Sequence, residues 1–353
     1  MMNEQQVREL VGALKDPFLH KTIAETNGII DVSIKEEKNH VSVKVAIAKT
    51  NTPEQMQLQM QVVDTLKNAG VGTVGIRFEE LPSETLEQFR GTATRAEAQD
   101  VLSPLNNVKF ISIASGKGGV GKSTVSVNLA VALARLGKKV GLIDADIYGF
   151  SVPDMMGVQT MPVVEEDRII PVDRLGVKMI SMGFFVEDNA PVVWRGPMLG
   201  KVLDQFFRDV EWGELDYLLL DLPPGTGDIA LDIHQMLPES NEIVVTTPHP
   251  TAAFVAARAG AMAIKTDHNI LGVVENMSWF QSKMSGEREF VFGEGGGPKL
   301  AEELRTELLG QIPLGQPDWN DVDFAPSVYA ENHSTGQIYL DIARNVIGKL
   351  EEK

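Results

Sequence analysis

A glycine-rich run, Gly116–Thr124 (GKGGVGKST), lies between a short apolar segment, 110–114, and a helical segment, 123–136. The run fits the pattern G-x-x-x-x-G-K-[ST], and a preceding strand and following helix are the context that this pattern requires. Glycines let consecutive main-chain N–H groups curl around an anion, and the N-terminus of the helix adds positive potential. The chain must therefore place a strand, a tight loop and a helix in direct succession, with phosphate groups as the expected ligand.

Further short apolar segments, each nearly unbroken, follow at 140–143, 217–220, 243–247 and 271–274. Such segments are typical of strands that are covered on both faces. Helical stretches separate most of them, and strands that alternate with helices predict a parallel sheet. We therefore expect an α/β fold of the P-loop NTPase type over residues 108–353, with a mostly parallel sheet covered by helices on both faces.

The first 80 or so residues have a different pattern. Alternating apolar residues at 30–34 and 41–47 predict a hairpin, and a third strand is expected at 74–78. Between them, Thr52 and Pro53 are a favourable start for a helix that ends near Gly70. Residues 1–80 are thus expected to form a small α+β domain, and the Pro-, Ser- and Thr-containing stretch 81–107 is expected to be a linker.

Composition limits the partners of the chain. Its 353 residues include 49 acidic and 32 basic side chains, for a formal net charge of −17. That balance repels nucleic acid and anionic lipid at long range, so nonspecific coating of DNA is not expected. No apolar run approaches ~18 residues and the opening MMNEQQVREL is polar, from which we expect no membrane contact and a cytoplasmic location. Cysteine is absent, which excludes disulfides and thiolate metal sites.

Two lysines and a serine in the glycine-rich run are candidate catalytic and metal-binding residues. Lys122 is expected to neutralise the β- and γ-phosphate oxygens of ATP, and Ser123 to ligate Mg²⁺. Lys117 is an extra cation that a phosphate cradle does not need, which suggests a charge delivered to the transition state, across a dimer interface. The residues expected to contact the nucleotide here are Gly116, Lys117, Gly118, Gly119, Val120, Gly121, Lys122, Ser123 and Thr124.

Aspartates follow two of the predicted strands, at the edge where an open parallel sheet binds its ligands. Asp144 and Asp146 end one strand, and Asp221 ends another, just before PPGTGD. Carboxylates at this edge can hold the water shell of Mg²⁺ and orient an attacking water. Each aspartate alone is as compatible with a turn-capping role. The glycines at 225 and 227 give the adjoining loop the freedom to rearrange when the γ-phosphate leaves.

The pattern KGGVGKST resembles the deviant Walker A ATPases of the MinD/ParA/NifH class. The resemblance implies that Lys117 reaches the nucleotide of a partner subunit, in a homodimer with two ATP molecules between the subunits. It also implies that Asp146 acts on the attacking water and that Asp221 holds Mg²⁺ through water. Asn276, at the end of GVVENM, and Pro313, in QIPL, are implied to contact the adenine base. A strand-end turn explains Asn276 nearly as well.

Several longer segments resemble a narrower family, the Mrp (ApbC-like) proteins, close to its cysteine-poor SalA-type members. These segments are LIDADIYGFSVPDMMG, WRGPML, DLPPGTGD, TTPHPTAAF and GVVENMS, and the N-terminal region resembles a MIP18-like domain. The family resemblance implies ATP-dependent binding and transfer of iron–sulfur clusters to a client protein, using a C-x-x-C pair after the NMS segment. Here Ser282 and Ser285 occupy that region, and serine is a poor iron ligand.

Two functions therefore stay open at the level of sequence. The first is a dimeric ATP-hydrolysing carrier of iron–sulfur clusters, which the overall resemblance favours and the absence of cysteine disfavours. The second is an ATP-gated switch that regulates protein partners or DNA, including transcription, which the resemblance to the cysteine-poor members favours. A membrane-associated switch is disfavoured, because the end of the chain, KLEEK, lacks a basic amphipathic helix.

Overall fold

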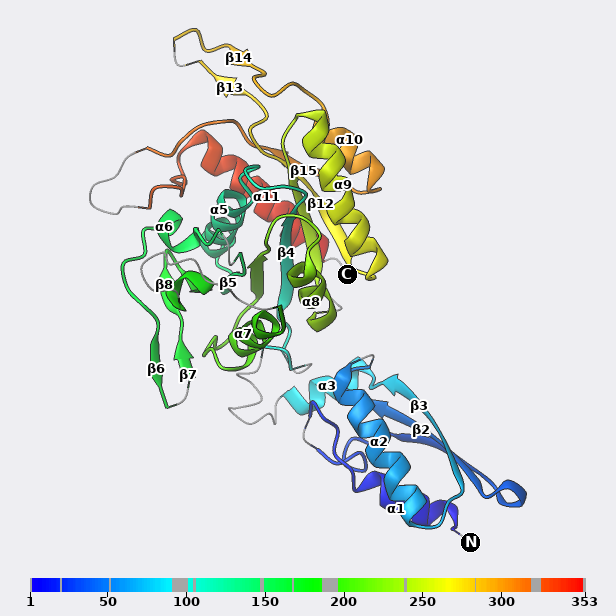
Figure 1. The fold of residues 1–353 in the computed structure, drawn as a ribbon. Coiled ribbons are helices and arrows are strands. Elements are labelled where there is room, and N and C mark those ends of the chain that lie inside the picture. The colour runs from blue at the N-terminus through cyan, green and yellow to red at the C-terminus, as the bar shows by residue number, and fades with distance from the viewer. Residues whose placement is uncertain are drawn as a thin grey trace. The chain divides into compact units, whose positions relative to one another are not determined.

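The computed structural model describes the whole chain except residues 1, 20, 51, 91–100, 104–105, 147–148, 167, 186–195, 238–239, 283, 319–324 and 352–353. Contacts between residues divide it into two units, Met1–Asn107 and Val108–Lys353, each of which has its own sheet (Figure 1). Within the described ranges, no helix combines the length and the hydropathy of a membrane span.

The N-terminal unit is a three-stranded sheet with helices packed against it (Figure 1). The expected hairpin is present, since β1 pairs with β2 in antiparallel fashion, and β3 then adds in parallel to β2. The crossover from β2 to β3 is helix α2, as a parallel connection requires. The elements are α1 (Glu4–Gly12), β1 (Ile29–Lys35), the 3₁₀ turn η1 (Glu36–Lys38), β2 (His40–Ile47), α2 (Pro53–Asn68), β3 (Thr73–Glu80) and α3 (Ser83–Arg90).

Helix α2 begins where the sequence predicts. The Thr52 side chain accepts a hydrogen bond from the main-chain N–H of Gln55 at 3.2 Å, and Pro53 stands at the first helical position. Helix α3 falls in the stretch expected to be a linker. Leu81 is buried, and Leu86 and Phe89 are partly buried against the same apolar cluster of the N-terminal unit. The structure therefore places the beginning of that stretch on the N-terminal unit.

The larger unit is built on an eight-stranded sheet. Its strand order is β15-β12-β11-β4-β10-β5-β9-β8, and every neighbouring pair is parallel except β8 with β9. The sequence-based expectation of a mostly parallel α/β sheet is confirmed. The strands are β4 (Lys109–Ser115), β5 (Val140–Asp144), β8 (Val172–Arg174), β9 (Val177–Ser181), β10 (Tyr217–Asp221), β11 (Asn241–Thr246), β12 (Asn269–Glu275) and β15 (Leu308–Gln311).

Helices cover both faces of this sheet. Alternate residues of β11 point to opposite faces: Ile243 and Val245 join the core beneath α5 (Lys122–Arg135) and α11 (Ser334–Glu351), whereas Val244 packs with α9 (Pro250–Lys265) and α10 (Gly296–Glu303). Shorter helices are α6 (Val152–Met156), which packs on α5, and α8 (Asp228–Met236), which packs on α7 (Gly196–Arg208). The glycine-rich run follows β4, a central strand with α5 directly behind it.

Several short strands were not expected from the sequence. They are β9, the edge strands β8 and β15, the hairpin of β6 (Val163–Glu165) with β7 (Arg168–Ile170), and the hairpin of β13 (Phe280–Gln281) with β14 (Arg288–Glu289). Except for β9, each has two to four residues, which is too short for a recognisable apolar period. The β13–β14 hairpin extends away from the rest of the larger unit (Figure 1).

Candidate functional site

The glycine-rich loop is fixed at both ends by close contacts. A Cβ atom at Gly116 would lie 2.3 Å from the main-chain nitrogen of Ala256 in α9, so a side chain cannot be accommodated there. At the other end, Gly121 has φ +79°, and a Cβ atom would lie 2.1 Å from the Asn276 amide nitrogen. Gly121 is also the N-cap of α5, so the loop leads directly into the N-terminus of a 14-residue helix.

The middle of the loop has room for a ligand. Lys117, Gly118 and Gly119 are exposed, and a Cβ atom at either of these glycines would meet no heavy atom within 4 Å. Val120, in contrast, is buried and anchors the loop in the core beside α5. An exposed loop of main-chain amides above a helix N-terminus fits a polyphosphate group.

Lys122, Ser123 and Asp221 come together as the sequence motifs suggested. The Lys122 ammonium lies 2.9 Å from Asp221 Oδ1, and the Ser123 hydroxyl donates to Asp221 Oδ2 at 2.6 Å. Ser126, one turn further along α5, donates to Asp221 Oδ1 at 2.5 Å. Asp221 is fully buried, so these three donors satisfy a carboxylate that water does not reach.

A second buried carboxylate, Asp144, lies on the neighbouring strand. Asp144 is the register partner of Asp221 between β5 and β10. Its Oδ2 accepts hydrogen bonds from the Ser181 hydroxyl at 2.9 Å and from the main-chain nitrogens of Ser151 and Val152. Burial and the nearby Asp221 charge raise the pKa of Asp144 to about 7. When both carboxylates are ionised, their charge exceeds that of the one lysine, and the carboxylate oxygens, with the hydroxyl of Ser123, are ligands that Mg²⁺ prefers.

Asp146 lies just beyond this pair. It is 8% exposed, and its main-chain N–H donates to Asp144 Oδ1 at 3.2 Å. The intervening Ala145 N–H donates to the carbonyl of Asp221 at 3.0 Å, which holds the segment against the end of β10. Asp146 therefore follows the acidic pair at the same edge of the sheet.

Lys117 is exposed at the tip of the loop. Its side chain makes no hydrogen bond or ion pair within the part of the chain that the structure describes. The main-chain carbonyl of Lys117, in contrast, accepts a hydrogen bond from the Ser115 hydroxyl at 3.2 Å. The main chain at this position is thus held by a hydrogen bond, while the ammonium is exposed.

Asn276 and Pro313 lie at the ends of adjacent strands, β12 and β15. The Asn276 amide nitrogen donates to the carbonyl of Val120 in the glycine-rich loop at 2.9 Å, and the residue is 5% exposed. Pro313 comes one residue after Ile312, whose N–H donates to the carbonyl of Glu275 at 2.8 Å. Asn276 therefore braces the loop, and Pro313 follows the end of the neighbouring strand β15.

Three residues at the site were not singled out for a role by the sequence: Ser126, Asp144 and Glu275. Ser126 follows Ser123 by three residues on one helix, a spacing that places both hydroxyls on one face. Glu275 is buried and accepts hydrogen bonds from the Ser278 hydroxyl at 2.9 Å, the Gln311 amide at 2.7 Å and the Gly297 N–H at 2.5 Å. These bonds connect the end of β12 to β15 and to the start of α10.

Comparison with known proteins gives a consistent set of relatives. Residues 106–347 match the family model described as the NUBPL iron-transfer P-loop NTPase of the ParA type. The chain is 63% identical over 350 residues to a Bacillus subtilis protein named iron-sulfur cluster carrier protein, covering 99% of each chain. It is 41% identical to a protein of the same name from Mycobacterium leprae, covering 95% of this chain and 87% of that one.

A solved structure has the same fold over the larger part of the chain. It is a nucleotide-binding protein from Archaeoglobus fulgidus in complex with ADP, 35% identical, with a TM-score of 0.54. The match covers 73% of this chain and 95% of that one.

Proposed function

Because this chain belongs to the NUBPL iron-transfer family of ParA-type P-loop NTPases, we propose that it binds ATP with Mg²⁺ and hydrolyses it. The observation that carries the proposal is the meeting of Lys122, Ser123 and Asp221 at the end of an open glycine-rich loop. The Lys122 ammonium and the Ser123 hydroxyl each lie within 3 Å of the Asp221 carboxylate, at the helix N-terminus where phosphates bind.

The proposed role of each residue combines its position with the resemblance to the deviant Walker A ATPases. Lys122 neutralises the β- and γ-phosphate oxygens, and the main-chain amides of Gly116–Thr124 orient the triphosphate. Ser123 and Asp221 would hold Mg²⁺, Asp221 through water; when bound, this ion neutralises charge on the phosphate oxygens. Asp146 orients the attacking water. The charge that develops at the γ-phosphate is met by Lys117, supplied by the other subunit of a homodimer.

The adenine base is expected on the side of the loop where Asn276 and Pro313 lie. Asn276 donates to Val120 in the loop, so its position and that of the phosphate cradle are coupled. A side-chain amide offers both a donor and an acceptor, which suits the edge of adenine. This assignment extends the site from the phosphates towards β12 and β15.

The loop after Asp221 connects the site to the rest of the unit. The Gly225 N–H donates to the carbonyl of Ser115, directly before the glycine-rich run, at 2.8 Å. Gly225 has φ +90°, a conformation that glycine adopts readily, and α8 begins three residues later. We infer that loss of the γ-phosphate changes this loop and α8, so that partners sense the state of the nucleotide.

The relatives are named as carriers of iron–sulfur clusters. This chain lacks the cysteine thiolates that usually hold such a cluster. The chain contains no cysteine. Ser282 and Ser285 lie in the turn of the β13–β14 hairpin, where the Ser285 N–H donates to the Ser282 hydroxyl at 3.3 Å. Over the described residues, no three His, Asp or Glu side chains are grouped to hold a metal ion. The residues present do not fit a cluster bound by thiolates.

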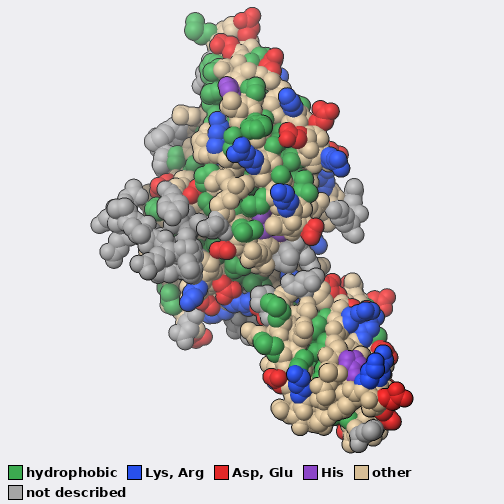
Figure 2. Space-filling view, turned by 45° about the vertical axis from the view of Figure 1, so that its right-hand side comes forward, with side chains coloured by type: hydrophobic (Ala, Val, Ile, Leu, Met, Phe, Trp, Pro, Cys, Tyr) green, Lys and Arg blue, Asp and Glu red, His purple; other side chains and the backbone are tan. Residues whose placement is uncertain are grey.

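The absence of cysteine favours a second function, an ATP-gated switch that acts on protein partners or DNA in the cytoplasm. On the face in Figure 2, lysine and arginine side chains are interspersed with acidic ones over the larger unit. Such a surface fits a protein client better than the phosphate backbone of DNA, which binds to clustered basic groups.

The experiment that tests both functions uses one purified sample. We expect magnesium-dependent release of phosphate from ATP, together with no retained iron or sulfide after anaerobic reconstitution. Absence of nucleotide affinity with Mg²⁺ present would overturn the ATPase proposal. Retention of stoichiometric iron and sulfide would instead restore the carrier function, with non-thiolate ligands.

A further inference from the structure

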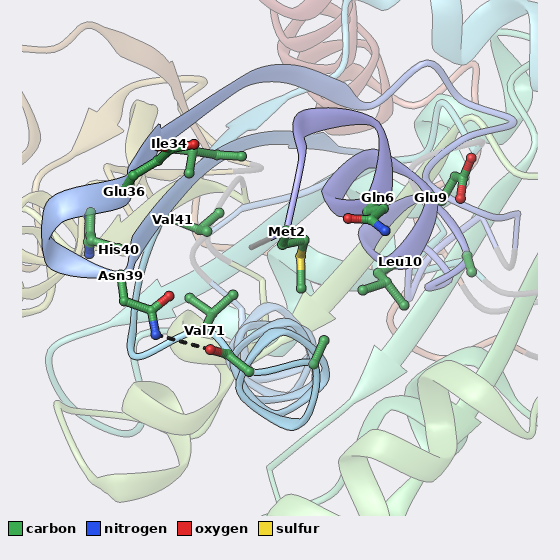
Figure 3. A pocket seen from close by; sticks show the side chains of 13 residues that line it. Met2, Gln6, Glu9, Leu10, Ile34, Glu36, Asn39, His40, Val41 and Val71 are labelled. Carbon is green, nitrogen blue, oxygen red and sulfur yellow. Dashed lines mark hydrogen bonds between the residues drawn. The ribbon is translucent and has the colours of Figure 1, made fainter.

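A groove of about 950 Å³ opens on the N-terminal unit, and none of the residues that line it belongs to the candidate ATP site. It lies between α1, the turn that joins β1 to β2, and the end of α2 (Figure 3). Val41 and Val71 are buried beneath it, and Met2, Leu10 and Ile34 are partly exposed along it. An apolar groove of this size holds a few side chains of a bound segment.

The charged residues of the groove are all acidic. Glu36, in η1, and Glu9, in α1, lie towards opposite ends of the view in Figure 3, with Met2 and Val41 between them. Both glutamates are exposed, and neither Lys nor Arg is among the described residues that line the groove. The end of α2 at Ala69 also borders the groove, and the C-terminus of a helix carries negative potential.

Nearby basic side chains do not cancel this charge within the groove. Arg8 bonds to Glu4 at 2.9 Å and to the carbonyl of Ile29, so its guanidinium is engaged on another part of α1. Lys35 and Lys38 are exposed on either side of Glu36 but do not line the groove. His40, which does line it, is held through both ring nitrogens by Thr73 and Ser42.

We propose that this groove binds a basic amphipathic segment of a partner protein. An apolar side chain of the segment inserts between Met2 and Val41, and lysine or arginine residues on either side of it pair with Glu9 and Glu36. The same charge disfavours acidic segments, nucleotides and anionic lipid surfaces. This function goes beyond ATP hydrolysis, because it gives the N-terminal unit the task of recruiting a client.

The test uses the full chain and two fluorescein-labelled probe peptides of equal length and equal apolar pattern. One carries leucine and lysine, and the other carries leucine and glutamate. By fluorescence anisotropy, we expect measurable binding only of the lysine peptide. This binding should weaken as the salt concentration is raised. The double variant Glu9→Gln/Glu36→Gln should lower the affinity for the lysine peptide roughly 2- to 10-fold, as expected for the loss of two exposed ion pairs.

A second variant and a control separate apolar from charged contacts. Leu10→Asn should weaken binding in low and high salt alike, since it removes an apolar contact from a partly exposed position. Glu87 is an exposed residue of α3 outside the groove, so Glu87→Gln should leave the affinity for the lysine peptide unchanged. Equal binding of both peptides, binding of neither, or the same affinity in the double variant would overturn the proposal. ATP turnover is measured on every variant and is expected to be unchanged, which keeps this test independent of the ATPase proposal.

Discussion

Two buried clusters of ionisable residues lie at opposite ends of the large sheet. At the carboxyl ends of β5 and β10, Asp144 and Asp221 meet Lys122. At the amino end of β11, Glu242 bonds to His234 of α8 at 2.9 Å, and the ring of His268 lies against that of His234, tilted by 42° with 4.3 Å between centroids. Both clusters are almost completely buried, yet they satisfy their charges in different ways.

The carboxyl-end cluster is surrounded by donors. Asp221 accepts from two hydroxyls and an ammonium, and Asp144 accepts from a hydroxyl and several main-chain N–H groups. Its two carboxylates outnumber its one lysine, so a bound cation improves the balance of charge. Such an arrangement is suited to binding Mg²⁺ and phosphate.

The amino-end cluster is paired mainly within itself. His268 also contacts the carbonyl of Leu237 through Nε2 at 2.9 Å, which ties the end of α8 to the start of β12. In the described part of the chain, His234 Nδ1 and Glu242 Oε1 have no hydrogen-bond partner. Because its described groups bond chiefly to one another, we assign this cluster to stability. The difference between the two clusters is the reason for placing the proposed nucleotide site at the carboxyl end, where acidic groups outnumber basic ones.

The largest expected effect comes from removing the lysine of the carboxyl-end cluster. Lys122→Ala should weaken ATP binding by at least ~100-fold, because the phosphate charge loses its nearest cation. Binding is measured by titration with a fluorescent ATP analogue, with circular dichroism to confirm folding. Lys139→Ala, an exposed lysine that pairs with Glu214, is the matched control. Wild-type affinity in Lys122→Ala would remove the phosphate-binding role of this residue.

The next largest effect separates binding from chemistry at the same edge of the sheet. Asp146→Ala should retain ATP binding and lose turnover by ~10²- to 10⁴-fold, the usual range for a residue that acts on the proton or position of a nucleophile. Phosphate release is measured at saturating ATP. Asp154→Asn, on the exposed side of α6, should keep the parent rate. A parent rate in Asp146→Ala would show that another group orients the water.

The two clusters also differ in how far the sequence predicts them. Gly116–Thr124 is contiguous, and a strand before it and a helix after it fix its conformation, so the local pattern is sufficient. Asp221 was predicted because it ends an apolar strand, and parallel strands bring such ends to one edge. The pairing of Asp144 with Asp221 is a matter of register between β5 and β10, which no local pattern determines.

The remaining contacts depend on tertiary structure. No local sequence pattern identifies the partner of Glu242, because its bond to His234 requires α8 to lie over the start of β11. The bond from Gly297 to Glu275 likewise depends on how α10 packs beside β12. The family and the fold could thus be predicted from the sequence. The hydrogen bonds that support the site residues could not be predicted, and neither could the groove of the N-terminal unit.

Breaking the amino-end cluster should reduce stability without affecting catalysis. His234→Ala leaves the buried Glu242 without its partner, for an expected loss of about 3 kcal/mol in the free energy of unfolding of the larger unit. All four tryptophans lie in residues 108–353, so denaturation followed by tryptophan fluorescence reports on that unit alone. Gln235→Ala, exposed on the same helix, is the control. If the variant lost ATP turnover while keeping its stability, the cluster would belong to the functional site.

The smallest expected effect is a pH dependence of stability that arises from His268. Burial lowers the pKa of His268 below its usual value of 6.5, and its hydrogen bonds to Leu237 and Thr266 oppose that shift only in part. The unfolded chain therefore binds more protons than the folded one just below pH 6.5, and this contribution to stability is lost as pH falls through the lowered pKa. The effect of Glu242 on the pH dependence has the opposite sign. Because burial raises the pKa of Glu242, its contribution to stability falls as pH rises above 4.5. His268→Gln should flatten the acid limb of the larger unit's stability curve, because the variant has no group at this position that binds protons more readily in the unfolded chain. An unchanged acid limb in this variant would mean that His268 binds protons equally in the folded and unfolded states, and His268 would then contribute packing alone.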